Sequence, residues 1–154
     1  MTEFDSKLSD CLHRFVPQFQ QLVKAERLSG GASQETYRLT VLVDGVELLL
    51  AMRRAPGGAD VERTAGYPGL DVEALLMQAA LAASVPAPTI HHVLSESDGL
   101  GEGFIMEWLG GETLGARIVK IPALDEIRPR LVFECGEVLA RIHAIKLESF
   151  GLDK

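Results

Sequence analysis

The sequence has few cysteines, no long apolar run and no excess of positive charge, and each of these absences excludes a class of protein. Its two cysteines, Cys11 and Cys135, form no CxxC motif. We therefore expect free thiols in a reducing cytoplasm rather than a disulfide framework or a redox or metal site. The longest apolar runs, at 48–52 and 79–83, are far shorter than the roughly 20 residues that cross a bilayer. The first residues also lack the pattern of a secretory signal, so we expect no membrane contact.

The charge balance is acidic. Fifteen Lys and Arg residues stand against 22 Asp and Glu residues, which gives a formal net charge of −7. An acidic surface repels a phosphate backbone, so we expect no nucleic-acid partner, although a small anion could bind at a local positive site. The 154 residues are a one-domain length, and with 47% hydrophobic residues they can form a core.

Apolar spacing and chain breakers predict alternating helices and strands. Helices are expected at about 6–16, 71–83, 113–119 and 130–145, and extended segments at 23–28, 36–43, 46–53, 89–94 and 103–108. Asp44-Gly45 predicts a tight hairpin, Asp71 a helix cap, and the apolar helix 71–83 a largely buried element. Strands joined by short links favour antiparallel pairing. The predicted fold class is therefore α+β, with about five antiparallel strands, a packed helix, an N-terminal helix and C-terminal helices.

We expect a single domain over residues 1–154. Its parts would be an N-terminal helix in 1–20, the sheet and central helix in 23–109, and a linker with helices in 112–147.

Two segments in the first half of the chain suit the binding of a phosphate. In Ser29–Ser33, glycines would let backbone N–H groups approach an anion, although an ordinary β-turn is the alternative. At the end of strand 46–53, period-two alternation puts Ala51 and Arg53 on one face and turns Arg54 to the other. A small residue there leaves room for a flat ring, and a cation about 7 Å further along would reach phosphates. A solvated strand end is the alternative.

Two further segments complete this arrangement. Glu73, in the first turn of helix 71–83, can pair with Arg53, although a surface Glu that favours the helix dipole is the alternative. The strand that ends in Met106–Leu109 is followed by Gly110-Gly111, which leaves backbone groups free for the edge of a base. A buried edge strand and a turn would give the same pattern.

These segments resemble a known family. Leu50-Ala51-Met52-Arg53 resembles the Val-Ala-Ile-Lys strand motif of protein kinases, with Arg in the place of Lys. The stretches LSGGASQETYRL, AMRRAPGG, SVPAPTI, GFIMEWLGGETL and LARIHAI resemble successive blocks of the aminoglycoside phosphotransferase and choline kinase superfamily. The resemblance runs from about Leu28 to Leu152.

The resemblance implies an N-terminal nucleotide-binding lobe of a kinase that phosphorylates a small-molecule hydroxyl with ATP or GTP. Its cofactor-binding residues on the phosphates would be Gly30, Gly31 and Ser33, with Arg53 on the α/β-phosphates and Glu73 orienting it. Ala51 would pack against the adenine ring, Met106 would lie at the back of the pocket, and the Glu107 carbonyl and Leu109 amide would hydrogen-bond the edge of adenine. Two positions depart from the family's pattern: Gln34 stands where relatives usually have Asn, and Arg53 replaces Lys.

The sequence contains no asparagine. Relatives carry a His-x-Asp-xxxx-Asn loop and a later Asp that position the acceptor and hold Mg²⁺. After Trp108 this chain has only Asp125, Asp153 and His143, at the wrong spacing. We therefore expect no catalytic or metal-ligating residues in these 154 residues, no turnover by the isolated chain, and Mg²⁺ and acceptor binding only with a second lobe.

Other features leave alternatives open. His91 and His92 would point to opposite faces of a strand, one exposed and one packed, so they are not expected to share a metal. The apolar stripe of helix 130–145, formed by Leu131, Cys135, Val138, Ile142 and Ile145, predicts self-association. The chain could also be a non-catalytic interaction module with the same fold, or an unrelated α+β domain. The last alternative predicts that Arg53 and Glu73 lie far apart.

Overall fold

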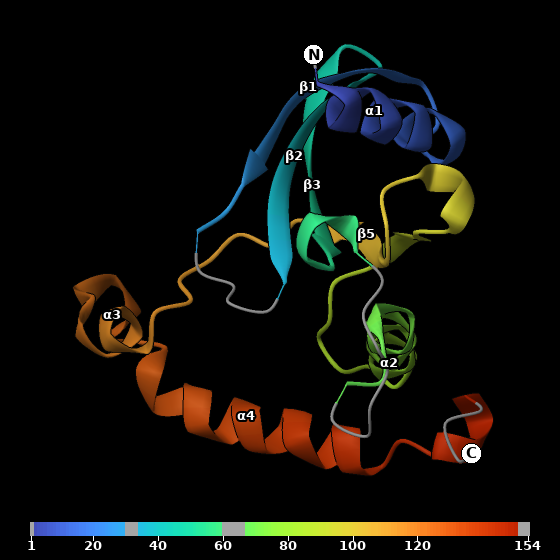
Figure 1. Ribbon diagram of the computed structural model, residues 1–154. Coiled ribbons are helices and arrows are strands. Elements are labelled where there is room, and N and C mark those ends of the chain that lie inside the picture. The colour runs from blue at the N-terminus through green and yellow to red at the C-terminus, as the bar shows by residue number, and fades with distance from the viewer. Residues whose placement is uncertain (1, 30–33, 60–66, 151–154) are drawn as a thin grey trace. The chain divides into compact units, whose positions relative to one another are not determined.

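The computed structural model describes residues 2–29, 34–59 and 67–150 (Figure 1). The helices are α1 (Glu3–Phe15), α2 (Leu70–Ala82), α3 (Gly115–Lys120) and α4 (Arg128–His143), with 3-10 turns η1 (Pro56–Gly58), η2 (Glu96–Asp98), η3 (Pro122–Leu124) and η4 (Leu147–Phe150). The strands are β1 (Phe19–Arg27), β2 (Glu35–Val43), β3 (Val46–Arg54), β4 (Ile90–Val93) and β5 (Gly103–Glu107). The chain divides into two compact units, one of residues 1–78 and 88–108, the other of residues 79–87 and 109–154.

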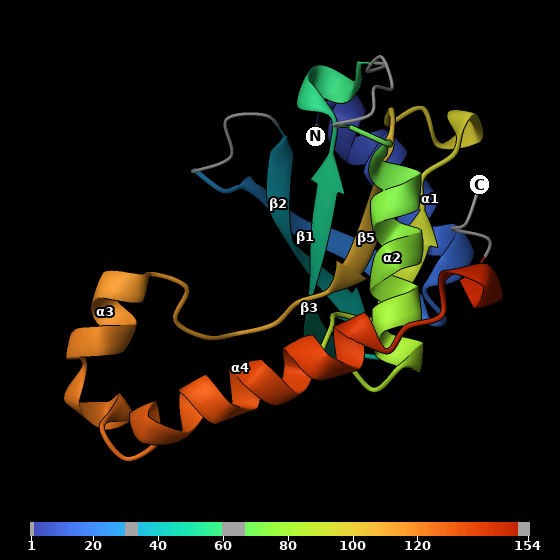
Figure 2. The ribbon, with the colours of Figure 1, turned by 90° about the horizontal axis from the view of Figure 1, so that it is seen from below.

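The first unit is built on one sheet with the order β1-β2-β3-β5-β4 and antiparallel pairing throughout. Figure 2 shows β3 between β2 and β5. The predicted α+β fold with a five-stranded antiparallel sheet is confirmed. The predicted hairpin is also present, because Asp44 and Gly45 have φ angles of 49° and 76°, the positive values that a two-residue turn of this kind requires.

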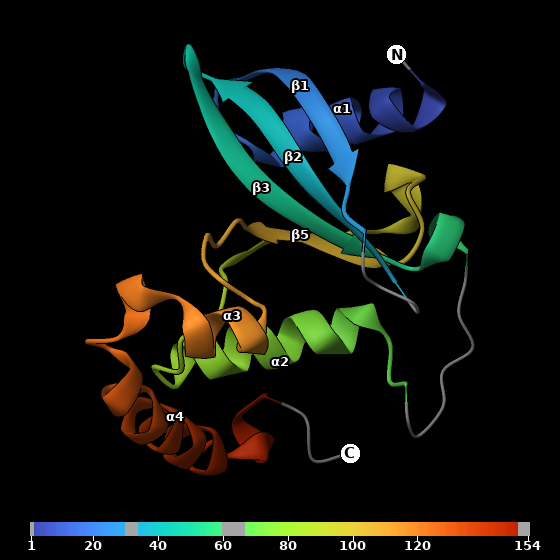
Figure 3. The same ribbon diagram turned by 90° about the vertical axis from the view of Figure 1, so that its left-hand side faces the viewer.

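Helices cover both faces of the sheet (Figure 3). On one face, α1 buries Leu8, Cys11 and Leu12 completely. Their partners on the strands are Leu39, Val41, Met52 and Ile105. On the other face, Leu70 and Ala74 of α2 pack with Phe104 and Ala55. Burial of these side chains supplies the main driving force for the layered arrangement.

The first helix and the first strand are longer than predicted. The side chain of Thr2 accepts a hydrogen bond from the Asp5 amide at 3.1 Å, and the Asp5 carboxylate accepts one from the Thr2 amide at 2.9 Å. This capping box starts α1 at Glu3 rather than residue 6. Strand β1 begins at Phe19 rather than residue 23, and two register shifts in its pairing with β2 break the alternation that the sequence pattern relies on.

Two predictions about helix α2 were wrong. The helix begins at Leu70, so Asp71 lies within its first turn instead of capping it, and the Leu70 amide donates to the Glu102 carboxylate at 2.6 Å. The helix is also not largely buried, because Leu76 and Leu81 are 45% and 42% exposed. One stripe, which includes Leu70 and Ala74, packs on the sheet, and apolar residues on the rest of the circumference do not.

The second unit contains α3 and α4. Arg128 joins them, since its Nε and Nη2 donate to the carbonyls of Ile118 and Ile121 at 3.0 and 2.6 Å. Arg141 joins α4 to the segment 79–87 through a 3.1 Å bond to the Ser84 carbonyl. None of the described helices is long and apolar enough to cross a membrane.

Candidate functional site

Arg53 is held by two side chains at the end of β3. Its Nη1 lies 2.9 Å from Glu73 Oε1, and its Nε donates to Gln34 Oε1. The Arg53 and Glu73 side chains are 36% and 27% exposed, so solvent still reaches the pair. Neither contact uses Nη2, the nitrogen at the other tip of the guanidinium group.

Strand pairing and packing explain why these two side chains meet. Arg53 pairs directly with Phe104 on β5, and Phe104 is fully buried against Leu70 and Ala74 of α2. That contact brings the first turn of α2, which carries Glu73, against the end of β3. The unrelated-domain alternative required Arg53 and Glu73 to lie far apart, so it is wrong.

Ala51 lies on the same face of the sheet as Arg53. It is 5% exposed, and its cross-strand neighbours are Arg38 on β2 and Met106 on β5. Met106 packs against the cluster around α2, and the Arg38 guanidinium lies 5.9 Å from the ring centroid of Trp108. A small residue next to a cation on one face is therefore present, as the alternation predicted.

Arg54 points to the opposite face, as predicted. Its Nε lies 2.9 Å from Glu35 Oε2, its Nη2 donates to the Tyr37 hydroxyl at 3.3 Å, and its guanidinium lies 4.5 Å from the ring centroid of Phe4. Burial would raise the pKa of Glu35, but the hydrogen bond and charge of Arg54 hold that pKa below its usual value. With side chains only 11% and 8% exposed, Arg54 and Glu35 stabilise the sheet rather than face a ligand.

Tyr67 lies close to Arg53 and Glu73, and no sequence pattern predicted it. Its hydroxyl is buried and, within the described parts of the chain, has no hydrogen-bond partner. Burial, followed by the charge of Glu102, raises the pKa of Tyr67. Gln34, Glu73 and Arg53 also lie close enough to affect this pKa. The Tyr67 hydroxyl nevertheless makes no hydrogen bond of good geometry with Gln34. No sequence motif marks this residue, because it follows a glycine-rich segment with no regular period.

Of the remaining predicted site residues, only Glu107 and Leu109 lie in the described part of the chain. The Glu107 amide donates to the Thr89 carbonyl at 2.8 Å, so this N–H is engaged in the sheet. Leu109 belongs to the second unit, and the expected role of its amide stays a prediction. Gly30, Gly31 and Ser33 lie outside the described residues.

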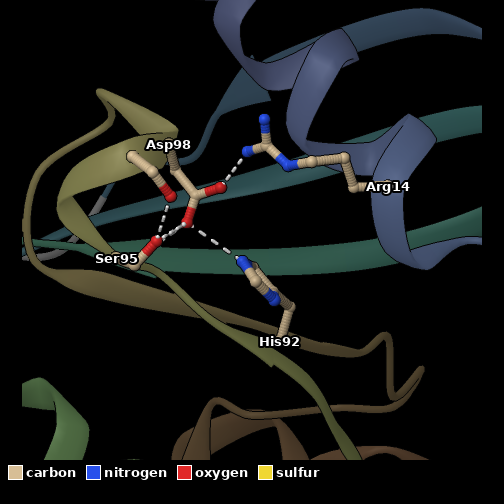
Figure 4. Close-up of polar contacts among 5 residues, drawn as sticks. Arg14, His92, Ser95 and Asp98 are labelled. Atoms are coloured by element: carbon tan, nitrogen blue, oxygen red, sulfur yellow. Dashed lines mark hydrogen bonds and ion pairs between the residues drawn. The ribbon is translucent and has the colours of Figure 1, made fainter.

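Asp98 forms a second polar cluster on the α1 side of the sheet (Figure 4). Its carboxylate accepts hydrogen bonds from Arg14, from the Ser95 amide and hydroxyl at 2.7 and 2.9 Å, and lies 3.0 Å from His92 Nε2. Burial would raise the pKa of Asp98, but the Ser95 amide, His92 and the Ser95 hydroxyl hold it well below its ordinary value. His91 is exposed and His92 is packed, as predicted.

Cys11, His92 and Asp98 place potential metal-ligating atoms within 4.8 Å of one another. The contacts around them do not suit a cation. Asp98 is already bonded to the positively charged Arg14, and burial followed by the Asp98 carboxylate raises the pKa of Cys11 to about 12, which keeps the thiol protonated. We interpret the cluster as a structural bridge between α1 and the segment from β4 to η2.

Comparison with models of protein families gives a match that covers most of the chain. Residues 24–154 match the model of the phosphotransferase enzyme family, APH. The matched region begins within β1 and includes Arg53, Glu73 and the strand that ends at Glu107. No curated protein matches the chain.

Proposed function

The chain belongs to the phosphotransferase enzyme family (APH), and on this premise we propose that it forms the nucleotide-binding part of an ATP-dependent kinase for a small-molecule hydroxyl. The observation that carries the proposal is the 2.9 Å contact between Arg53 Nη1 and Glu73 Oε1. A carboxylate that holds a cation at the end of a strand orients that cation toward an anionic group.

The residues present fit the phosphates of a nucleotide. Glu73 contacts one edge of the Arg53 guanidinium, and Arg53 and Glu73 are both partly exposed. A planar guanidinium group donates to phosphate oxygens in pairs, which a Lys ammonium group cannot do. On the same face, Ala51 has no bulky side chain that would exclude a flat ring. We therefore assign the phosphates to Arg53 and the base to the space beside Ala51 and Met106, with the Glu107 carbonyl at its edge. Gly30, Gly31 and Ser33 remain proposed phosphate contacts.

This proposal predicts that Arg53→Ala weakens ATP binding by at least about tenfold and leaves adenosine binding unchanged, because a hydrogen bond to a charged group contributes about 1.5–3 kcal/mol. Both affinities can be followed by the fluorescence of Trp108, the single tryptophan of the chain.

Arg130→Ala is the matched control, since Arg130 lies on α4 and its side chain is 75% exposed. If the wild-type chain binds ATP and Arg53→Ala binds it equally well, Arg53 does not contact the phosphates. If the wild-type chain binds no nucleotide, the non-catalytic interaction module becomes the better interpretation.

We further propose that the 154 residues alone do not transfer phosphate. The sequence has no asparagine and no His-x-Asp-xxxx-Asn segment, so it offers neither the expected acceptor-positioning group nor the expected ligands of Mg²⁺. The acceptor and Mg²⁺ would then need a second lobe. We also assign the protein to the cytoplasm, where Cys11 and Cys135, both free, would stay reduced.

A further inference from the structure

We propose that Gln34 is a positioning residue for Arg53, and that Gln34 and Glu73 together aim the Arg53 guanidinium at the phosphates of a nucleotide. The inference rests on the function proposed above and adds a residue to it. Gln34 immediately precedes β2, and its side-chain oxygen accepts a hydrogen bond from Arg53 Nε.

The two contacts on Arg53 act at different atoms of one rigid plane. Gln34 holds Nε, near the base of the guanidinium group, and Glu73 holds Nη1 at its tip. Because the five N–H bonds of a guanidinium group have fixed directions, two acceptors set the orientation of the whole plane. The N–H bonds of Nη2 take part in neither of these two contacts, and in the proposed arrangement they point toward a phosphate.

The position of Gln34 is itself fixed from the other side of the sheet. The next residue, Glu35, is 7% exposed and pairs with Arg54, the residue after Arg53. Two consecutive residues at the start of β2 therefore hold two consecutive residues at the end of β3, one pair on each face. The buried Glu35–Arg54 pair anchors the backbone from which the Gln34 side chain extends.

Chemistry explains why an uncharged side chain suits this position. Glu73 already balances the charge of Arg53, and a second carboxylate would leave the group with a net negative charge beside an anionic ligand. The Gln34 amide accepts a hydrogen bond without adding charge. Lys at position 53 would have no donor in the place of Nε, so it could not make the contact that Arg53 makes with Gln34 while Glu73 holds the tip of the side chain.

The experiment is a double-mutant cycle of Gln34→Met and Arg53→Lys in the 154-residue chain, with ATP and adenosine as ligands. Gln34→Met keeps the length of the side chain and removes the acceptor. We expect it to weaken ATP binding about fivefold and to leave adenosine binding unchanged, and to have no effect on ATP binding when Lys is already at position 53. Gln21→Met, an exposed position on β1, is the matched control.

Each outcome separates this inference from the proposed function. If the wild-type chain binds ATP and Gln34→Met binds it equally well, Gln34 does not position Arg53 and the proposed function stands. An equal loss for ATP and adenosine would mean that Gln34 only stabilises the fold. A fivefold loss that persists with Lys at position 53 would show that Gln34 acts independently of Arg53 and would overturn the inference. If the wild-type chain binds no ATP, both the inference and the proposed function are wrong.

Discussion

At the scale of single residues, the ionised Asp98 side chain stabilises the contact between α1 and the turn after β4. Its side chain is 1% exposed, and its carboxylate takes hydrogen bonds from Arg14 on the helix and Ser95 beside the turn. Breaking such a cluster leaves buried donors without acceptors, at a cost of about 1–3 kcal/mol. His92 is fixed in the same cluster by its ring, which stacks on Phe15 at 4.7 Å between centroids.

The depressed pKa of Asp98 gives this cluster a defined pH dependence. Because the pKa of Asp98 is lower in the folded than in the unfolded chain, ionised Asp98 stabilises the fold above its unfolded pKa of about 4, and this contribution is lost as the pH falls below that value. We predict that Asp98→Asn lowers the melting temperature at pH 7 and reduces the further loss of stability between about pH 5 and pH 2. Thermal unfolding followed by circular dichroism at several pH values would measure both effects.

Asp10→Asn is the control for this prediction, because Asp10 is an exposed carboxylate on the same helix. An Asp98→Asn variant as stable as the wild type at pH 7 would show that the cluster contributes nothing to the fold.

Sequence patterns predicted Ala51, Arg53 and Glu73 but neither the contact of Gln34 with Arg53 nor the place of Tyr67 beside it. Alternation along β3 and the first turn of α2 are local properties, so they could be read from the chain. The Gln34 contact joins residues 19 apart in the sequence, and the Arg14–Asp98 contact joins residues 84 apart. Neither pair has a local pattern, because the pairing follows from how the strands and α1 pack.

At the scale of elements, α4 presents a large apolar surface. Val132 and Phe133 are 76% and 75% exposed, and Leu139 and Ile142 are 52% and 43% exposed. An apolar surface on one side of the helix is lined by Leu131, Glu134, Cys135, Val138, Leu139 and Ile142. Exposed apolar area of this kind favours association.

We predict that the chain self-associates through the stripe of α4 as its concentration rises, and that Val138→Glu reduces this association. Ala140→Glu is the control, because it adds the same charge about half a turn away from Leu131, on the other side of the helix. Sedimentation velocity over a range of concentrations would measure the association. A wild-type chain that stays monomeric at high concentration would contradict the prediction.

Element boundaries were predicted well where the local sequence signal is strong. They were predicted poorly where contacts between distant segments determine the boundary. Asp44-Gly45 predicted the hairpin correctly, because the positive φ angles of the turn depend only on the two residues that form it. The burial of α2 was overestimated because its composition is apolar on all sides, and composition does not say which sides meet a partner. The cap of α2 was missed because Glu102, which bonds the Leu70 amide, lies 32 residues away.

At the scale of the whole molecule, the order of strands and helices predicted the architecture of the first unit. A hairpin, one helix and a second strand pair with short links leave few ways to form an antiparallel sheet, and the structure adopts one of them. The expectation that residues 1–154 act as one domain remains a prediction, as do the nucleotide and its acceptor. The family match supports the nucleotide and the acceptor, and the Arg53–Glu73 contact supports the nucleotide.

The most direct measurement of the central claim is a nuclear magnetic resonance titration of the ¹⁵N-labelled chain with ATP. We predict that the largest chemical-shift changes occur at the Arg53 Nε–H group and at the backbone amides of Ala51, Arg53 and Glu73, and that adenosine leaves the Arg53 Nε–H signal unchanged. Changes confined to the α1 side of the sheet, around Arg54 and Asp98, or no changes at millimolar ATP, would contradict it.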